Sequence, residues 1–277
     1  MCVPYFALII KANVVLLWHN NQKRARACSL KYHTQYIGKA MSFSFKQFHI
    51  DDAHCAMKVG TDGVLLGAWA NVCEADRILD VGCGCGLIAL MAAQRNRAAR
   101  VVGVELDAAA AADALANVQH SPFASNVEIV CADVLQYAAD CGLAFDSILS
   151  NPPYHEESLL PPASQRAKAR HTQGGGLTFA ALLRVVEHLL NPANPKATFS
   201  AILPMSAVAG FVAMAAVHGL QLTRRTDVVT RKGRPCKRVL LEFCRTPQSL
   251  VHTTLSLVGD DGTRAEAYAD LCKDFYL

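Results

Sequence analysis

Short apolar runs alternate with longer amphipathic stretches along most of the chain. Apolar runs that end in glycine, proline or acidic residues are typical of buried strands, and apolar positions at helical spacing indicate helices between them. The pattern predicts strands at residues 77–81, 100–105, 127–131, 145–150, 197–203, 220–229 and 238–244. It predicts helices at residues 87–94, 107–119, 177–190 and 206–218.

The order of these elements predicts an α/β fold. Because strands alternate with helices, the seven predicted strands should form a doubly wound, mostly parallel, Rossmann-like sheet. The last two predicted strands have no helix between them, so they should pair as an antiparallel closing hairpin. The segment 155–176 is rich in Pro, Ser, Gln and Gly and is predicted to be a long loop, with a length typical of functional lids or disordered segments.

The first 41 residues differ in character from the rest. Residues 6–18 are apolar but interrupted by polar residues, and no basic region precedes them as in a secretory signal. No apolar run reaches the ~18–20 residues that cross a bilayer. We therefore predict one domain at residues 42–277. Residues 1–41 would be a dispensable extension or an artefact of start-site choice, with Met41 as the true start; a weak membrane-associating segment is the alternative.

The composition indicates a globular protein whose charge is unevenly distributed. Hydrophobic residues make up 52% and charged residues 18% of the 277 residues, which excludes a disordered chain. Six of the 27 Lys and Arg residues but none of the 23 acidic residues lie in residues 1–41, so residues 42–277 carry a net charge of −2. Any contact of this body with phosphate therefore requires a local basic patch.

The cysteine pattern favours a reducing cellular compartment and does not indicate a metal site. The chain has 11 cysteines but no CxxC pair, and Cys83 and Cys85 form a lone CxC in a glycine-rich stretch. This pattern disfavours a secreted disulfide scaffold and a zinc ribbon. Because free thiols suit a reducing compartment, we predict a cytoplasmic protein with no metal site.

The first predicted strand runs into Asp-Val-Gly-Cys-Gly-Cys-Gly, in which Asp80 precedes Gly82, Gly84 and Gly86. Glycines let the backbone turn sharply and let a ligand approach it closely. The dinucleotide fingerprint GxGxxG fails from Gly82, because the sixth residue is Leu87, and from Gly84 it gives only the weak match GxGxxA. A carboxylate before the turn would repel a pyrophosphate but suit an ammonium group. The turn therefore favours S-adenosylmethionine over NAD.

Two more acidic residues follow the next predicted strands. Glu105 ends the second strand, 19 residues after Gly86, where it can accept hydrogen bonds from ribose hydroxyls in either cofactor. Asp133 follows the third strand and is placed to meet the amine of an adenine ring, or alternatively to serve as a helix N-cap or turn residue. With Asp80 these carboxylates would line the carboxyl edge of the sheet, where open α/β sheets bind ligands.

The fourth predicted strand ends in Asn151, Pro152, Pro153 and Tyr154. Two prolines can simply stop a strand. The corner also suits methyl transfer to a planar nitrogen, whose delocalised lone pair makes it a poor nucleophile. The Asn151 oxygen and the Pro152 carbonyl can accept its hydrogens and turn the lone pair toward a methyl group, while the prolines hold the corner rigid. Tyr154 offers a face on which a flipped base can stack.

The glycine-rich turn and the Asn-Pro-Pro-Tyr corner together resemble the S-adenosylmethionine-dependent amino methyltransferases. More narrowly, residues 42–277 resemble the tRNA1(Val) adenine-37 N6-methyltransferases. The segments that carry this narrower resemblance are 43–52, 55–69, Asp227 with 238–243, and 268–277. One departure is that the two cysteines of the turn are bulkier than the residues that this family tends to have there.

The resemblance implies a class I methyltransferase domain at residues 42–277 that methylates the N6 amine of an adenine beside the anticodon. It also implies that Thr61 and Asp62 lie beside the methionine end of the cofactor; either residue could also cap a helix. It implies tRNA, through its anticodon loop, as the partner. No stable protein partner and no membrane contact are implied, and a monomer is favoured.

Basic residues gather in the closing hairpin and in the long loop, although the body as a whole is slightly acidic. Such a run is often only a solvated face, but here it can supply the local patch that phosphate contacts need. The residues are Arg224, Arg225, Arg231, Lys232, Arg234 and Lys237 in the hairpin, and Arg166, Lys168 and Arg170 in the loop. Together with the corner, they predict an RNA substrate.

Three other functions are compatible with parts of the pattern. A protein glutamine N5-methyltransferase would use the same corner for a planar amide, but the basic clusters favour RNA. A NAD-dependent oxidoreductase is disfavoured by Asp80 and by the lack of a hydride-site motif. An adaptor that only binds the cofactor is disfavoured by the intact corner.

Overall fold

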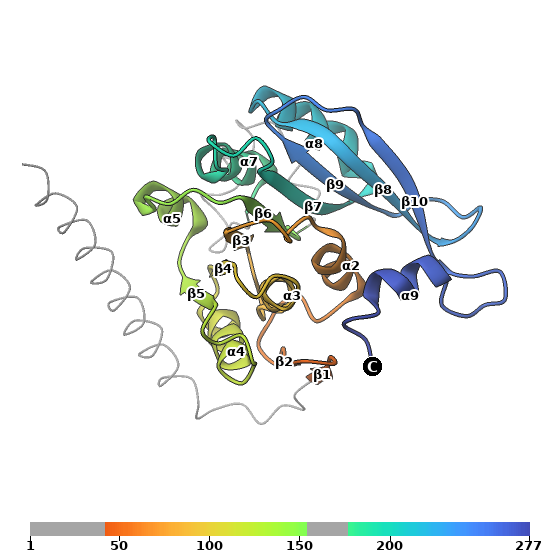
Figure 1. Ribbon diagram of the computed structural model, residues 1–277, viewed down its shortest axis with the longest axis horizontal. Helices are drawn as coiled ribbons and strands as arrows, with labels where there is room; N and C mark the ends of the chain where they lie inside the picture. Colours follow the sequence, from red (N-terminus) through yellow and green to blue (C-terminus); the bar gives the residue numbers. More distant parts are fainter. Residues whose placement is uncertain (1–41, 154–176) are drawn as a thin grey trace, which may run out of the picture.

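The computed structural model describes residues 42–153 and 177–277, which fold around one central sheet (Figure 1). Among these residues, the sheet has eight strands in the order β10-β8-β9-β7-β6-β3-β4-β5. The strands are β3 (Arg77–Val81), β4 (Arg100–Glu105), β5 (Val127–Cys131), β6 (Ser147–Ser150), β7 (Thr198–Pro204), β8 (Gln221–Arg231), β9 (Arg238–Cys244) and β10 (Val251–Val258). A separate ribbon pairs β1 (Ser42–Ser44) with β2 (His49–Asp51).

The strand directions confirm the predicted fold class. Strands β5, β4, β3, β6 and β7 pair in parallel, and β9 runs antiparallel between β7 and β8 as the predicted closing hairpin. The predicted number of seven strands is one too few, because β10 adds a further strand parallel to β8. The sequence pattern missed β10 because its first four residues are exposed and its sequence, VHTTLSLV, is partly polar.

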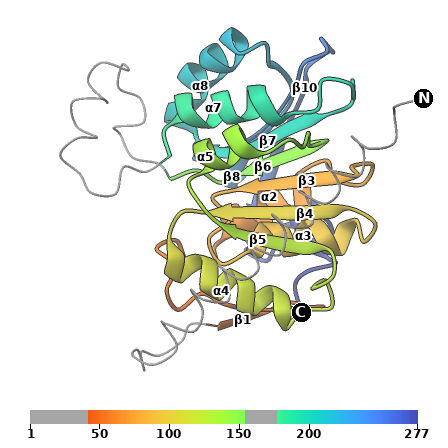
Figure 2. The same ribbon diagram turned by 90° about the vertical axis from the view of Figure 1, so that its left-hand side faces the viewer.

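Helices cover both faces of the sheet and enclose one apolar core on each side (Figure 1). One core contains side chains of α2 (Thr61–Trp69), α3 (Leu87–Arg95), α4 (Ala108–Gln119) and α9 (Glu266–Cys272). The other contains side chains of α5 (Val134–Asp140), α7 (Phe179–Leu189) and α8 (Met205–Val217). Figure 2 shows α5, α7 and α8 together on one side of the strands and α4 on the other. No described helix is long and apolar enough to cross a membrane.

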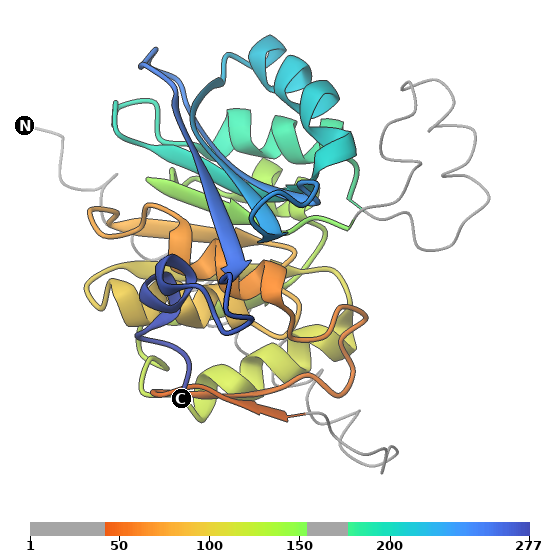
Figure 3. The same cartoon turned by 90° about the vertical axis from the view of Figure 1, so that its right-hand side faces the viewer.

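The C-terminal residues of the chain lie beside the first described residues. Figure 3 shows β10 on the outer side of the sheet, with α9 following it and the C-terminus close to β1. There the backbone N–H of Lys46 donates to the carbonyl of Phe275 at 2.9 Å, and the Lys46 ammonium donates to the carbonyl of Lys273 at 2.6 Å. The last residues of the chain are therefore part of the same folded unit.

The strand register places the carboxyl ends of the parallel strands and the β8–β9 turn at the same edge of the sheet. The carboxyl ends of the parallel strands meet at this edge, and Pro204 at the end of β7 faces Arg238 at the start of β9. Val228 of β8 also faces Arg238, so the β8–β9 turn projects from the edge where the parallel strands end. Open α/β sheets bind ligands along this edge.

Candidate cofactor and substrate site

The glycine-rich turn between β3 and α3 leaves open space beside its backbone. Gly82, Gly84 and Gly86 have φ angles of 70°, 54° and 81°, a left-handed conformation that side chains disfavour. The backbone N–H groups of Gly82 and Cys83 donate to the carbonyl of Val104 at 2.9 and 3.1 Å, which fixes the turn to β4. A Cβ atom on Gly82 or Gly84 would meet nothing within 4 Å. This cradle lets a ligand approach the main chain.

The two cysteines of the turn fit without filling this space, because both are buried in the core. The Cys83 sulfur lies 2.9 Å from where a Cβ atom of Gly103 would stand, so a glycine in β4 makes room for it. Burial raises the pKa of the Cys83 thiol well above its ordinary value, which keeps it neutral. Cys85 shares a hydrogen bond with Cys55, which lowers the pKa of Cys85 and raises that of Cys55.

Asp80 is completely buried at the end of β3 and has an incomplete set of hydrogen-bond partners. Its Oδ2 accepts a hydrogen bond from the Ala89 N–H at 3.0 Å, whereas its Oδ1 is buried without a partner. Burial, with a smaller contribution from Glu105, raises the pKa of Asp80 to about 7, and the Ala89 N–H opposes this shift. A cationic donor would satisfy Oδ1 and favour the carboxylate. The residue therefore fits the ammonium group of an amino acid.

Glu105 and Asp133 both hold backbone groups, as well as lying where the sequence predicts ligand contacts. Glu105 Oε2 accepts from the Gly84 N–H at 2.8 Å, and its Oε1 accepts from the Asp107 N–H at 2.9 Å. Glu105 thus joins the cradle to the start of α4. Asp133 caps α5, since its Oδ1 accepts from the Leu135 N–H at 2.7 Å, and its side chain is exposed. The N-cap interpretation of Asp133 is confirmed; a contact with adenine stays a prediction.

The Asn-Pro-Pro corner stands beside the cradle. Ser150 pairs with Val81 in the parallel register, and its hydroxyl donates to the Val81 carbonyl at 3.0 Å. The corner that follows is thus one strand spacing, about 4.8 Å, from the end of β3. Pro152 is buried and Asn151 is half-buried. Tyr154 lies outside the described residues.

The sequence analysis missed Met57, which contacts the corner. The Asn151 Nδ2 donates to the Met57 sulfur at 3.3 Å, although Met57 is 46% exposed. The oxygen and the nitrogen of an amide point in different directions from the amide carbon. This contact therefore turns Nδ2 toward Met57 and Oδ1 away from it. The only signal in the sequence was that Met57 lies in the segment 55–69 that carries the family resemblance.

The segment that carries Met57 is held against the cradle by α4. Asn117 is 5% exposed; its Oδ1 accepts from the Asp51 N–H, and its Nδ2 donates to the carbonyls of Asp51 and Cys85 at 2.8 and 2.9 Å. Asp113 accepts from the backbone N–H and the ring Nδ1 of His54, both at 2.8 Å. One helix therefore positions the segment before α2 and the glycine-rich turn together.

Thr61 and Asp62 are the first residues of α2, so neither is its N-cap. Gly60 occupies that position, and no side chain caps the helix, so the alternative interpretation of these residues as caps is wrong. Asp62 Oδ2 accepts a hydrogen bond from Arg238 Nε at 2.7 Å. This ion pair joins the start of α2 to the start of β9 at the carboxyl edge. A contact of Thr61 or Asp62 with the cofactor stays a prediction.

The basic residues of the hairpin fall into two groups. Arg224 lies 3.6 Å from the centre of the Trp69 ring and donates to Glu242 Oε2 at 2.7 Å, and Arg225 Nε donates to Asp227 Oδ1 at 2.7 Å. These two arginines are thus partly engaged within the fold. The four exposed residues are Arg231, Lys232, Arg234 and Lys237, in or beside the β8–β9 turn. Arg166, Lys168 and Arg170 lie outside the described residues.

A doubly wound sheet with this cradle, a buried acid before it and an Asn-Pro-Pro corner beside it defines a class I methyltransferase that uses S-adenosylmethionine. The family model "Methyltransferase small domain" matches residues 55–181. The chain belongs to the family of tRNA1(Val) (adenine(37)-N6)-methyltransferases. A member from Bacteroides fragilis is 42% identical over 236 residues, which cover 85% of this chain and 97% of the relative. One from Erwinia tasmaniensis is also 42% identical, over 85% and 94% of the two chains.

The fold is also shared with a solved structure of lower similarity. The crystal structure of a predicted O-methyltransferase from Agrobacterium tumefaciens matches with a TM-score of 0.60 at 20% identity. The match covers 77% of this chain and 96% of that one, which shows a common fold. No group of three His, Cys, Asp or Glu side chains that could hold a metal ion occurs within the described parts of the chain.

Proposed function

We propose that this protein transfers a methyl group from S-adenosylmethionine to the N6 amine of adenine 37 in tRNA1(Val). The observation that carries the proposal is the Asn151 corner, held beside the open glycine cradle by the Ser150–Val81 hydrogen bond. The names of the relatives support the substrate. Family membership does not favour a protein glutamine methyltransferase or an oxidoreductase.

The corner would prepare the amine for reaction without a general base. Bound S-adenosylmethionine supplies an electrophilic methyl group. Asn151 Oδ1 and the Pro152 carbonyl would accept the two N–H groups of the amine, which orients its lone pair toward that methyl group. The Met57 contact on Nδ2 leaves Oδ1 facing the other way, so the acceptor is preorganised. As the new C–N bond formed, the methyl–sulfur bond of the cofactor would break and leave S-adenosylhomocysteine, and the nitrogen would then lose its extra proton to solvent.

The remaining predicted contacts form part of the same proposal. Asp80 would bind the ammonium group of the cofactor and Glu105 its ribose hydroxyls, while Asp133 would meet the adenine amine. Thr61 and Asp62 would lie near the methionine end. The exposed cations of the β8–β9 turn and the basic residues of the long loop would contact the anticodon loop. The protein would work in the cytoplasm without a stable protein partner.

A labelling experiment tests the function. The protein is incubated with methyl-labelled S-adenosylmethionine and either total tRNA or protein extract, and tRNA nucleosides are then separated. Label should appear in tRNA as N6-methyladenosine. Label in protein alone would identify a glutamine methyltransferase and contradict the proposal.

The Asn151→Ala variant tests the role of the corner. The single-turnover rate should fall by about 100-fold, the loss typical of removing one preorganised polar contact. Calorimetric affinity for S-adenosylmethionine should stay nearly unchanged, because Asn151 is placed to contact the target amine. A folded variant that keeps more than about a tenth of the wild-type rate would show that the amide is not the acceptor.

A further inference from the structure

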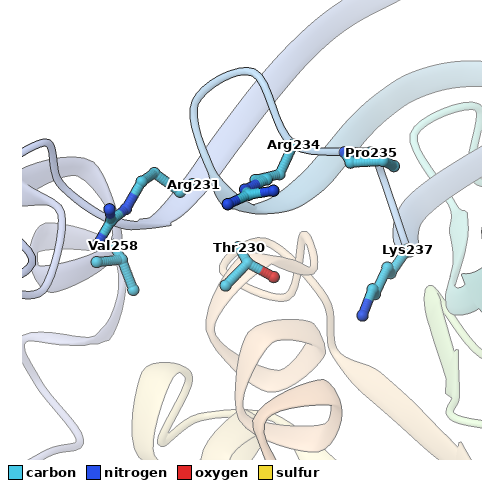
Figure 4. Close-up of a pocket in the computed structure, with 6 residues that line it drawn as sticks. All are labelled: Thr230, Arg231, Arg234, Pro235, Lys237 and Val258. Atoms are coloured by element: carbon cyan, nitrogen blue, oxygen red, sulfur yellow. The ribbon is translucent and has the colours of Figure 1, made fainter.

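The β8–β9 turn surrounds a cavity of about 540 Å³ that opens beside the end of β10 (Figure 4). The cavity is lined by Thr230, Arg231, Arg234, Pro235, Lys237 and Val258. Three of these six side chains are cationic and one is a hydroxyl, while none is acidic. Figure 4 shows the Arg234 guanidinium above Thr230, with Arg231 on one side and Lys237 on the other. The lining is therefore suited to an anion.

The backbone of the turn brings these cations together. The Arg234 N–H donates to the Arg231 carbonyl at 3.0 Å, which closes a tight turn around Lys232 and Gly233. Gly233 has a φ of 78°, a left-handed conformation that a glycine adopts without strain. The turn thus folds Arg234 back toward Arg231. It presents two guanidinium groups, whose planar forks match the oxygens of a phosphate.

The charge of this cavity contrasts with the basic residues earlier in β8. Arg224 and Arg225 each form an ion pair with a carboxylate of the fold, at 2.7 Å. Close to Arg231, Asp261 in the loop after β10 accepts the backbone N–H and the hydroxyl of Thr263 at 2.9 and 2.8 Å, and it does not line the cavity. Hydrogen bonds from Thr263 and, to a smaller extent, the charge of Arg231 lower the pKa of Asp261, so Asp261 offsets part of the charge of Arg231. No acidic side chain is among the residues that line the cavity, so the lining keeps an excess of positive charge.

The cavity and the methyl-acceptor corner share one edge of the sheet. Arg231 is the last residue of β8 and pairs with Val258 at the end of β10, while Asn151 follows the end of β6. In the strand order, β7 and β9 separate β6 from β8. The register sets Ser150 of β6 level with Arg225 of β8, so Arg231 lies six residues further along β8, about 20 Å at 3.3 Å per residue. The cavity is thus too far from the corner to contact the target nucleotide itself.

We propose that this cavity is a phosphate-binding subsite that holds one phosphodiester of the substrate RNA outside the target nucleotide. The inference rests on the proposed function and adds where the RNA backbone is held. Arg231, Arg234 and Lys237 would bind the phosphate oxygens, and the Thr230 hydroxyl would donate a further hydrogen bond. The subsite fixes the register of the RNA, whereas the corner selects the base.

Arginine variants test the subsite by direct binding of unmodified tRNA over a range of salt concentrations. Arg234→Ala should lower the affinity at least fivefold and flatten the slope of log K against log salt by about 0.7–0.9, the value of one phosphate contact. Arg184→Ala removes the same charged group from an exposed position on α7 and serves as the matched control, with less than a twofold effect. Arg234→Lys should restore part of the affinity and of the slope.

The Lys232→Ala variant tests whether RNA binds in the cavity or to any positive charge of the turn. Lys232 is exposed in the same turn but does not line the cavity, so its loss should weaken binding less than that of Arg234. In methylation assays, Arg234→Ala should raise KM and leave the single-turnover rate at saturating tRNA near the wild-type value. Equal losses for Lys232→Ala and Arg234→Ala, or no loss for either, would overturn the subsite.

The test distinguishes failure of the subsite from failure of the proposed function. Wild-type protein that methylates tRNA, with Arg234→Ala binding tRNA as tightly as wild type, would reject the subsite and leave the function standing. Wild-type protein that fails to methylate tRNA would reject the function. The binding comparison between Arg234→Ala and Arg184→Ala decides the subsite in either case, because it does not depend on turnover.

Discussion

Asp80 shows how burial changes the protonation of one carboxyl group. Its pKa of about 7 in the folded chain lies well above its value in an unfolded chain, because burial disfavours the charge. The folded state therefore holds the proton more tightly than the unfolded state. The contribution of Asp80 to stability is fully present below pH ~4 and is lost as pH rises toward about 7. An ammonium partner reverses this preference.

The affinity for S-adenosylmethionine should depend on pH through Asp80. Below pH 7, where Asp80 binds a proton, affinity should fall by up to about tenfold per pH unit, because binding must release that proton. Asp80→Asn should weaken binding at least tenfold at pH 8 and remove the pH dependence. Calorimetry at pH 5.5–8, in two buffers with different ionisation enthalpies, measures both effects. A wild-type affinity that is flat over this range would reject the role of Asp80.

Met57 should act as a positioning residue for the Asn151 amide. Met57→Leu keeps the apolar volume but removes the sulfur acceptor, so the single-turnover rate should fall by roughly two- to tenfold, the worth of one hydrogen bond. KM for tRNA should change less than this rate. Met214→Leu, at a half-buried methionine of α8 outside the proposed site, is the control and should retain the wild-type rate. Equal rates in all three proteins would show that Met57 does not orient the amide.

At the scale of elements, one asparagine of α4 joins three parts of the site. Asn117 connects the last residue of β2 with the glycine-rich turn, and a buried amide that loses such bonds leaves several backbone groups without partners. Asn117→Ala should therefore lower the free energy of unfolding by about 2–3 kcal/mol, measured by denaturant titration. Gln136→Ala, on the exposed face of α5, should change it by less than about 0.5 kcal/mol. If Asn117→Ala lowered the free energy of unfolding by less than about 0.5 kcal/mol as well, Asn117 would not hold these parts of the structure together.

The sequence predicted elements well where burial imposed a strong pattern, and less well elsewhere. The strands that form the middle of the sheet are buried and apolar, so their runs were clear, whereas β10 is partly polar and exposed. Arg224 is basic in the sequence, but its partners Trp69 and Glu242 lie 155 and 18 residues away. Spacing along the chain cannot reveal such contacts. The hydrogen bonds of Asn117 and the Met57 contact were missed for the same reason.

At the scale of the whole molecule, residues 42–153 and 177–277 form an eight-stranded sheet with an apolar core on each face. Residues 1–41 lie outside the described structure and contribute six positive charges and no acid. A chain that begins at Met41 should therefore fold and methylate tRNA at a rate near that of the full chain. Thermal unfolding and single-turnover assays of both chains check this. A folded but inactive shorter chain, or a full chain that partitions into membranes, would show that the extension has a function.

The cradle and its acids have a consequence for the turnover of the enzyme. In the proposed roles, Asp80 binds the ammonium group, Glu105 the ribose and Asp133 the adenine amine, and all three groups remain when the methyl group has left. The spent cofactor, S-adenosylhomocysteine, would therefore keep these anchoring contacts and compete with fresh donor for the same site. The rate of methylation in the cell would then follow the ratio of donor to spent cofactor, which links tRNA modification to the methyl supply of the cell.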